Sequence, residues 1–391
     1  MSTSTLGRMQ VRRPGYGAMQ LAGPYAFGPP PDRATAVGVL RAAVVAGVDH
    51  IDTAQYYGPG AVNGLIRDAL YPYPDGLAIV SKVAVRPDDG GAVPPAGDPD
   101  RLRQAIQDNL RSLRVGQLAA VNLRLPGGGR VDARFDDQLA AMVAARDEGL
   151  IAGVGLSNVS LDQLRHAAAG TGIVCVQNLF HLAFRYGTPV LDECLRRGIA
   201  FVPFCPLGWP RGLDNPVLTS PVVIQTAARL GITPAQVALQ WLLRLAPNVL
   251  LIPGTGSVAH LRENLAAERV ALDDEATCAT WTASAPDTGS SSDRASQRMR
   301  DELTAALQAR CEESLADGAT DWTCYHQPKQ PPGRPGHGQG VVLSYGFACG
   351  GRRACAGSHG KYARKTAWCL RGRSAVSAWA PESSLRSPPG W

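Results

Sequence analysis

Residues 50–58 read HIDTAQYYG, and residues 77–83 read LAIVSKV. The first stretch ends an apolar run, which predicts a strand with Asp52 at its carboxyl end and Tyr57 in the loop beyond it. The second stretch is apolar enough to form a strand buried on both faces, with Lys82 near its end. Because a buried ammonium is costly unless a carboxylate pairs with it, we expect Asp52 to be the partner of Lys82.

The same three side chains form a candidate acid–base group. An ammonium beside a phenol favours the phenolate, so we expect Lys82 to lower the pKa of Tyr57 from its ordinary value of about 10. Tyr57 is then a candidate general acid. The plainer interpretation is that each residue caps a strand or makes a surface ion pair, but three such groups in neighbouring strand–helix units favour a shared site.

Apolar runs alternate with helical patterns over most of the chain. This alternation predicts a parallel (β/α)8 barrel of the TIM type, with an N-terminal hairpin that includes residues 10–13. The expected barrel strands are residues 16–21, 48–52, 77–83, 118–123, 151–156, 173–176, 199–203 and 249–252. The expected helices are residues 33–46, 61–70, 98–113, 135–148, 160–168, 189–197, 221–230, 234–245 and 258–267.

The character of the sequence changes near residue 277. We expect residues 1–285 to form the barrel domain. Residues 286–391 read as an extension rich in Gly, Pro, Ser and Arg that is largely disordered, with a possible helix at 294–315.

Composition excludes several classes of partner. The net charge is +6, but residues 325–391 hold ten basic residues and one acidic residue, which leaves 29 basic and 32 acidic residues before them. The barrel region is thus mildly acidic, and we expect no nucleic-acid partner. No apolar run suits a signal peptide or a membrane span, so we expect no membrane association and a cytoplasmic location. The nine cysteines show no zinc-binding spacing, so we expect no metal.

The motif D-T-A-x-x-Y-G at residues 52–58, followed by S-K at residues 81–82, resembles the aldo-keto reductase family. The resemblance extends from about residue 15 to residue 276. It implies the (β/α)8 barrel, reduction of a carbonyl group with a nicotinamide cofactor, and catalytic roles for Asp52, Tyr57 and Lys82.

Arg124 departs from the family pattern. The loop after the fourth strand usually supplies a catalytic histidine in this family, and the stretch LAAVNLRLP at 118–126 places Arg124 there. An arginine stays charged and donates five hydrogen bonds, so Arg124 can polarise a carbonyl oxygen or hold an anion but cannot relay a proton. An Arg at a strand end paired with a loop carboxylate is the competing interpretation.

The resemblance also implies a nicotinamide site. Ser157, Asn158 and Gln177 match the residues that hold the carboxamide in the family, and their amide and hydroxyl groups suit that task. In the stretch FCPLG, Phe204 matches the aromatic residue that stacks on the nicotinamide ring. In the family the loop that follows lies along the pyrophosphate. The resemblance therefore implies that Cys205, Pro206, Leu207 and Gly208 contact the cofactor.

A glycine-rich turn before the last helix carries the strongest cofactor signal. In IPGTGSVAHLRENLAA, residues 252–267, backbone N–H groups and a helix N-terminus can face an anion. By resemblance, the phosphate-binding residues are Gly254, Thr255 and Gly256, and His260 replaces an arginine near the adenosine 2′-phosphate, while Glu263 and Asn264 contact the adenine. We expect NADPH as the cofactor, with NADH possible because neutral imidazole is a weaker phosphate partner.

Within the family, the stretches GYGAMQLAGP and AHLRENLAA resemble a bacterial branch that contains pyridoxal reductases. The expected function is NADPH-dependent reduction of a small carbonyl substrate, pyridoxal to pyridoxine being the single best candidate. A slow-turnover sensor or regulatory barrel and a protein inactivated by a foreign C-terminal segment remain alternatives. The sequence leaves the oligomeric state open.

Overall fold

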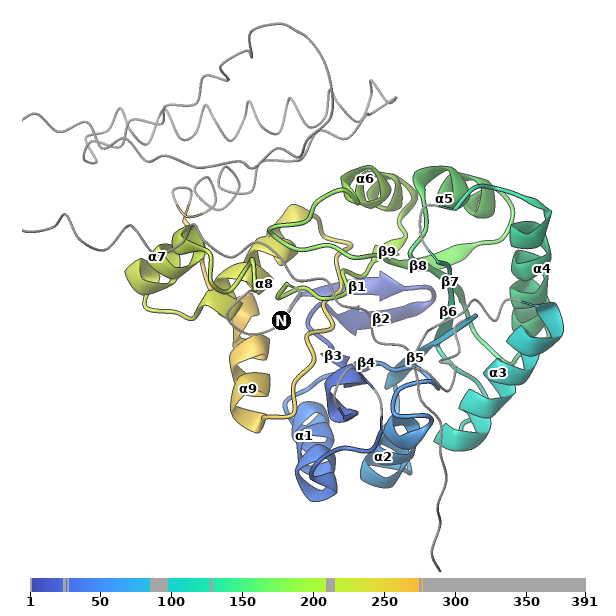
Figure 1. Cartoon of the computed structure of the whole chain (residues 1–391), viewed down its shortest axis with the longest axis horizontal. Coiled ribbons are helices and arrows are strands. Elements are labelled where there is room, and N and C mark those ends of the chain that lie inside the picture. Colours follow the sequence, from blue (N-terminus) through green and yellow to red (C-terminus); the bar gives the residue numbers. More distant parts are fainter. Residues whose placement is uncertain are drawn as a thin grey trace, which may run out of the picture. The chain divides into compact units, whose positions relative to one another are not determined.

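A ring of parallel strands surrounded by helices forms the centre of the described part of the chain (Figure 1). The computed structural model describes residues 2–23, 26, 28–84, 98–126, 129–208, 215–273 and 276. The predicted extension at 286–391 and its helix at 294–315 lie outside these residues. None of the described helices is both long and apolar enough to cross a membrane.

Seven parallel strands pair in chain order. They are β3 (Tyr16–Gly17), β4 (His50–Asp52), β5 (Ala78–Val83), β6 (Ala120–Arg124), β7 (Val154–Ser157), β8 (Ile173–Gln177) and β9 (Ala200–Phe201). The helices are α1 (Arg33–Val45), α2 (Ala61–Leu70), α3 (Pro99–Leu113), α4 (Ala133–Asp147), α5 (Leu161–Ala168), α6 (Thr188–Arg197), α7 (Pro221–Leu230), α8 (Pro234–Leu245) and α9 (Val258–Ala266), with short 3-10 turns η1 (Ala18–Leu21) and η3 (Ala267–Arg269).

The eighth position of the ring is closed by single bridges. Val249 bridges to Phe201 of β9, and Leu251 bridges to Pro14 just before β3, both in the parallel sense. The Leu251 amide donates to the Arg13 carbonyl at 2.8 Å. The predicted strand at 249–252 therefore occupies its expected place, and the (β/α)8 barrel is confirmed.

The first elements differ from the prediction. The hairpin consists of β1 (Thr3–Leu6) and β2 (Met9–Arg12), and β1 was not expected because Leu6 is its only buried residue. In Figure 1 this hairpin lies inside the ring of strands. The predicted strand at 16–21 ends after Gly17, where the chain turns into η1.

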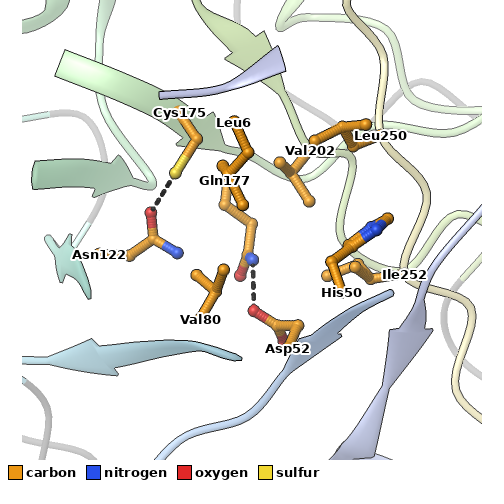
Figure 2. A pocket seen from close by; sticks show the side chains of 10 residues that line it. All are labelled: Leu6, His50, Asp52, Val80, Asn122, Cys175, Gln177, Val202, Leu250 and Ile252. Atoms are coloured by element: carbon orange, nitrogen blue, oxygen red, sulfur yellow. Dashed lines mark hydrogen bonds between the residues drawn. The ribbon is translucent and has the colours of Figure 1, made fainter. Parts of the chain in front are cut away.

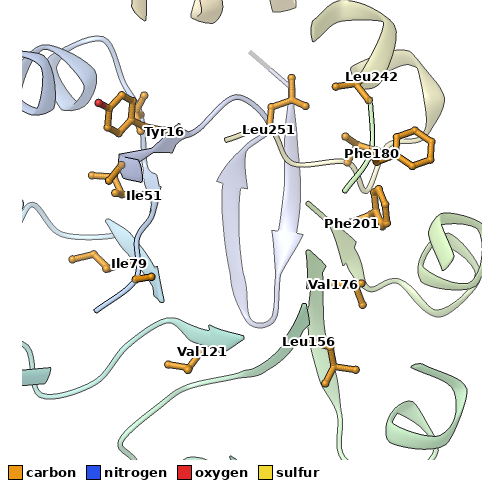
Figure 3. Packing of buried hydrophobic residues seen from close by; sticks show 14 of the residues in the cluster. Tyr16, Ile51, Ile79, Val121, Leu156, Val176, Phe180, Phe201, Leu242 and Leu251 are labelled. Carbon is orange, nitrogen blue, oxygen red and sulfur yellow. The ribbon is translucent and has the colours of Figure 1, made fainter. Parts of the chain in front are cut away.

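Two layers of apolar side chains follow from the alternation of each strand. Within β5, Ile79 and Val83 pack in the large cluster between strands and helices, whereas Ala78 and Val80 belong to the smaller cluster that includes Leu6 of the hairpin. Figure 3 shows side chains of the large cluster on the outer face of the ring, with the hairpin in its centre. Lys82 shares the face of Ala78 and Val80, so it enters the barrel interior.

Gly17 stands where the barrel backbone is too crowded for a side chain. A Cβ built on Gly17 would lie 2.3 Å from the Ile252 carbonyl oxygen. We expect Gly17→Ala to lower the free energy of unfolding by about 1–3 kcal/mol, because backbone must shift. The matched control is Gly38→Ala, on the exposed side of α1 with no atom within 4 Å, which should raise stability by up to about 1 kcal/mol. Equal denaturation midpoints for the two variants would contradict the crowding argument.

Candidate active site

The carboxyl ends of the barrel strands bring the predicted catalytic residues to one mouth. Asp52 ends β4, Lys82 is the fifth residue of β5, and Arg124 ends β6. Strands β4 and β5 pair directly, as do β5 and β6, so these side chains come from three consecutive strands. Active sites of parallel barrels form at this end.

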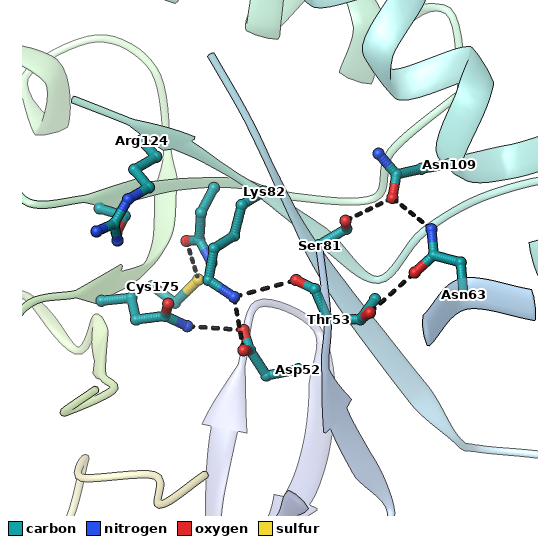
Figure 4. A network of polar contacts seen from close by, with 11 residues as sticks. Asp52, Thr53, Asn63, Ser81, Lys82, Asn109, Arg124 and Cys175 are labelled. Carbon is teal, nitrogen blue, oxygen red and sulfur yellow. Dashed lines mark hydrogen bonds and ion pairs between the residues drawn. The ribbon is translucent and has the colours of Figure 1, made fainter. Parts of the chain in front are cut away.

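A buried ion pair lies at the centre of the mouth. The Lys82 Nζ donates to Asp52 Oδ2 at 2.6 Å and to the Thr53 carbonyl at 3.0 Å. The side chains of Lys82 and Asp52 are 2% and 6% exposed. Asp52 Oδ1 accepts a further bond from Gln177 Nε2 at 2.8 Å. Asp52 is therefore held by two donors, and the pairing expected from the sequence is present (Figure 4).

Tyr57 lies next to this pair. Its ring centroid is 5.1 Å from the Lys82 Nζ, and the Tyr56 ring meets it edge to face at 5.1 Å. The residue is 5% exposed. The structure thus brings Asp52, Lys82 and Tyr57 together as predicted.

The predicted lowering of the Tyr57 pKa is wrong. Burial raises the pKa of Tyr57 well above its ordinary value, and the Asp52 carboxylate raises it further. The Arg124 cation and a hydrogen bond with Tyr56 oppose this rise without overcoming it. The ammonium of Lys82 faces the ring of the tyrosine, and loss of solvent around the phenol outweighs the attraction of nearby cations. Tyr57 therefore keeps its proton at neutral pH.

A second polar network was missed by the sequence. The Thr53 hydroxyl donates to Asn63 Oδ1 at 2.8 Å, Asn63 Nδ2 donates to Asn109 Oδ1 at 3.0 Å, and the Ser81 hydroxyl donates to the same oxygen at 2.6 Å. Thr53 and Ser81 are the chain neighbours of Asp52 and Lys82, and their side chains extend to α2 and α3 (Figure 4). In the sequence, the one signal for this network was Asn63, a polar residue within the apolar face of α2. Since the four side chains are all buried, this network fixes the strands that carry the ion pair.

The predicted carboxamide residues lie side by side at the ends of β7 and β8. Ser157 pairs with Gln177 in the sheet register, and the Asn158 amide donates to the Gln177 carbonyl at 3.1 Å. Gln177 Oε1 is buried and has no hydrogen-bond partner among the described residues. Gln177 also lines a small pocket in the barrel interior with Asp52 and Asn122 (Figure 2).

Strained backbone marks the strand ends at the mouth. Ala84, Asn158 and Cys205 have φ values of 74°, 64° and 52°, in the left-handed region that non-glycine residues rarely adopt. Asn tolerates this conformation better than Ala or Cys does. Strain of this kind concentrates at functional sites, where surrounding structure holds it.

The loop after β9 continues the mouth. Phe204 is half-buried and lies under Arg124, whose Cζ is 5.1 Å from the ring centroid. Cys205 and Gly208 close a turn through a 2.9 Å bond from the Gly208 amide to the Cys205 carbonyl. Pro206 is buried in this turn and Leu207 half-buried. Residues 209–214, the next part of the predicted pyrophosphate loop, lie outside the described residues.

The glycine-rich turn leads into α9 as expected. Gly256 is exposed with no atom within 4 Å of a built Cβ, and Ser257 caps the helix by accepting from the His260 amide at 3.4 Å. Thr255 Oγ1 accepts from the Ser257 amide at 3.0 Å, and the Thr255 carbonyl accepts from the Tyr16 hydroxyl at 2.6 Å. This turn joins the start of the barrel to its end.

The predicted adenosine residues lie along α9. His260 is exposed at the first turn, and Asn264 is 5% exposed. Glu263 Oε1 accepts from the Thr233 hydroxyl at 2.6 Å, so this carboxylate already joins α9 to the start of α8. The structure shows no contact between these three side chains and the ion pair at the mouth. They stay candidates for the far end of a long ligand.

This geometry defines an α/β barrel with a buried Asp–Lys pair beside a tyrosine at the carboxyl ends of its strands. The chain belongs to the aldo/keto reductase family, since the family model matches residues 15–281. It is 47% identical over 277 residues to pyridoxine 4-dehydrogenase of Escherichia coli, covering 70% of this chain and 95% of that protein. An uncharacterized oxidoreductase of Schizosaccharomyces pombe is 36% identical over 277 residues, covering 70% of this chain and 87% of that protein.

Solved structures agree with this assignment. An aldo/keto reductase from Klebsiella pneumoniae, in complex with NADP and acetate, superposes with a TM-score of 0.62 at 26% identity, covering 74% of this chain and 98% of that one. The protein is therefore an oxidoreductase of this family.

Proposed function

We propose that this protein reduces an aldehyde or ketone to an alcohol with NADPH, and that pyridoxal is its substrate. The observation that carries the proposal is the buried Asp52–Lys82 pair beside the protonated Tyr57 at the barrel mouth. The 47% identity to a pyridoxine 4-dehydrogenase supports the choice of substrate.

The residues present fit a nicotinamide cofactor. The unpartnered Gln177 Oε1 can accept a hydrogen bond from a carboxamide NH2. The Ser157 hydroxyl and the Asn158 amide side chain stand at the end of the neighbouring strand β7. The open Gly256 and the start of α9 suit a phosphate, because backbone N–H groups and the helix dipole favour negative charge there. Phe204 offers an aromatic face. When bound, NADPH supplies the hydride.

The chain's own residues handle the proton. Tyr57 holds its proton at neutral pH and donates it to the carbonyl oxygen as negative charge develops there. Lys82 then stabilises the resulting phenolate, and Asp52 holds Lys82 in place with a 2.6 Å bond. Solvent returns the proton to Tyr57 after the alcohol leaves.

A direct assay tests the proposal. Purified protein is mixed with NADPH and pyridoxal, benzaldehyde or methylglyoxal, and the loss of NADPH absorbance is followed. We expect oxidation of NADPH with pyridoxal to be the fastest and the product to be pyridoxine. If simple aldehydes were reduced and pyridoxal were not, the protein would be a reductase with another substrate. If no aldehyde were reduced, both the proposed activity and the proposed substrate would be wrong.

His260 provides a test of cofactor preference. The imidazole is exposed at the first turn of α9, where we propose the adenosine 2′-phosphate to bind. His260→Arg should tighten NADPH about 10-fold or more and leave NADH unchanged, because a charge-assisted, bidentate contact to phosphate replaces a neutral one. Titrations followed by nicotinamide fluorescence would measure both. Equal tightening of the two cofactors would show that residue 260 does not meet the 2′-phosphate.

A slow-turnover sensor is the second candidate. Arg124 cannot donate a proton in place of the family's histidine, and the raised pKa of Tyr57 makes it a weak acid. If a Tyr57→Phe variant retained the turnover of the parent protein while binding NADPH tightly, the sensor would be favoured.

We also propose the division of the chain after residue 285 and a cytoplasmic location. The family match ends at residue 281, in support of this boundary. A protein ending at residue 285 that exceeds the full chain in turnover would indicate that residues 286–391 inhibit it. One that is less soluble would indicate that the extension contributes to the fold.

A further inference from the structure

Arg124 occupies a central place at the mouth. It is the last residue of β6 and stands opposite Ser157 of β7 in the sheet register. Its Nη1 donates to the Ser157 hydroxyl at 3.3 Å, and its Cζ lies 5.1 Å from the centroid of Phe204. The side chain is half-buried. The guanidinium thus lies against two of the proposed nicotinamide residues, Ser157 and Phe204.

No carboxylate of the described residues pairs with this cation. Ion pairs within 4.0 Å join other arginines to acids, such as Arg229 to Asp273 at 2.6 Å, but none in the described part of the chain includes Arg124. Among the described residues, its five N–H donors make one hydrogen bond, the long one to the Ser157 hydroxyl. The expected structural role, an ion pair with a loop acid, is therefore absent from the described residues.

The electrostatic effect of Arg124 reaches both phenols. Its charge lowers the pKa of Tyr56 and of Tyr57 against the larger effect of burial. A carbonyl oxygen that accepts the proton of Tyr57 therefore comes within the electrostatic reach of this guanidinium. A half-buried cation without a counter-ion favours a ligand that brings negative charge.

We propose that Arg124 selects aldehydes that carry an ionised oxygen on the ring carbon next to the one bearing the carbonyl group, as in ortho-hydroxyaryl aldehydes. This inference rests on the proposed reductase function. In such a phenolate two oxygens point the same way, so one N–H of the planar guanidinium can bind the carbonyl oxygen and another the phenolate. The hydride goes to the aldehyde carbon and the proton of Tyr57 to its oxygen, while the phenolate oxygen takes no part in bond making.

The contact explains why a cation can stand where a proton-relaying histidine is usual. A fixed positive charge binds the substrate more strongly once the substrate is an anion. A histidine would instead compete with the substrate for the phenol proton. The preference should therefore grow as pH rises through the pKa of the substrate phenol.

Matched aldehydes test this inference. The probes are 2-hydroxybenzaldehyde, 4-hydroxybenzaldehyde and benzaldehyde, with NADPH and the full chain, and the measured quantity is kcat/KM for each. We expect the 2-hydroxy compound to be preferred over the 4-hydroxy compound. Arg124→Gln should reduce this preference about 10- to 100-fold, the range for a hydrogen bond to a charged group. Arg124→Lys should keep part of it, because the charge remains and the fork is lost.

Two controls separate the outcomes. Arg101→Gln removes an arginine that is 69% exposed on α3 and should leave the preference unchanged. Quenching of protein fluorescence by 2-hydroxybenzaldehyde in the presence of NADP+, which supplies no hydride, gives a binding readout that should weaken in Arg124→Gln alone. An unchanged denaturation midpoint shows that this variant is folded.

Equal losses of kcat/KM for all three aldehydes in Arg124→Gln would show that Arg124 acts on the carbonyl oxygen alone and would overturn the inference. If glyoxylate is added as a fourth substrate, a loss of kcat/KM confined to it would replace the inference with a carboxylate site. Absence of turnover with every aldehyde would remove the proposed function, and this inference with it, whereas turnover without an ortho preference removes only the inference.

Discussion

Replacing Tyr57 with phenylalanine is expected to lower kcat for carbonyl reduction about 100- to 10,000-fold, the range that a positioned general acid supplies. The ring stays, so its contact with Lys82 at 5.1 Å and its edge-to-face packing on Tyr56 are kept. The hydroxyl that we propose as the proton donor is lost. Binding of NADPH, measured by nicotinamide fluorescence, should not change, which separates chemistry from folding and cofactor binding.

Tyr56→Phe is the matched control. Tyr56 is half-buried beside Tyr57, and its hydroxyl stabilises the Tyr57 phenolate through one hydrogen bond. Loss of one hydrogen bond should lower kcat at most about 10-fold. A larger loss of kcat in Tyr56→Phe than in Tyr57→Phe would show that Tyr56, and not Tyr57, donates the proton.

The pH profile provides a second check on Tyr57. Reduction needs the protonated phenol, and activity is lost as pH rises through its pKa. Burial raises this pKa above the ordinary value, so the loss moves to higher pH. We expect no fall in kcat from tyrosine ionisation below the ordinary pKa of about 10. A fall in kcat near neutral pH that disappears in Tyr57→Phe would mean that a bound ligand or Lys82 lowers the pKa of Tyr57 by more than burial raises it.

The sequence predicted the barrel because its signal is local. A strand buried on both faces reads as an apolar run, as AIVSKV of β5 does, and the run itself places Lys82 in the barrel. The strand β1 buries a single residue, so nothing in its sequence separated it from a polar terminus. Position 17 requires glycine because the carbonyl of Ile252 lies against it, a contact over 235 residues that no local pattern contains.

The same distinction holds at the site. The pairing of Asp52 with Lys82 could be predicted because a buried ammonium needs a carboxylate, whatever the register of the strands. The 2.6 Å bond agrees with that prediction. The bond from Gln177 to Asp52 joins strands that are not neighbours in the sheet, and could not be inferred. The direction of the Tyr57 pKa depends on how completely the phenol is buried, a property of the assembled barrel, whereas the sequence shows only which charges are near.

The buried pair should also be the most sensitive point of the fold. Lys82→Met leaves the Asp52 carboxylate buried with one neutral donor, Gln177, and we expect the free energy of unfolding to fall about 3–5 kcal/mol. Asp52→Leu leaves the ammonium with the Thr53 carbonyl alone and should cost a similar amount. Removing the cation of the exposed pair Arg101–Asp98 by Arg101→Met should cost less than about 1 kcal/mol.

The double variant Asp52→Leu/Lys82→Met separates stability from catalysis. Two apolar side chains of suitable volume replace a pair whose desolvation is costly, so the double variant should be more stable than either single variant. The one remaining cost is that Gln177 Nε2 loses its acceptor, Asp52 Oδ1. Its kcat should stay about 100-fold or more below the parent, because the Lys82 ammonium beside the Tyr57 ring is gone and Arg124 alone is left to stabilise the phenolate. Denaturant unfolding and NADPH oxidation measured on the same four proteins test both statements. If the losses of the two single variants simply added in the double variant, Asp52 and Lys82 would not act as a pair, and if the double variant reduced aldehydes at the parent rate, the charge beside Tyr57 would have no part in the reaction.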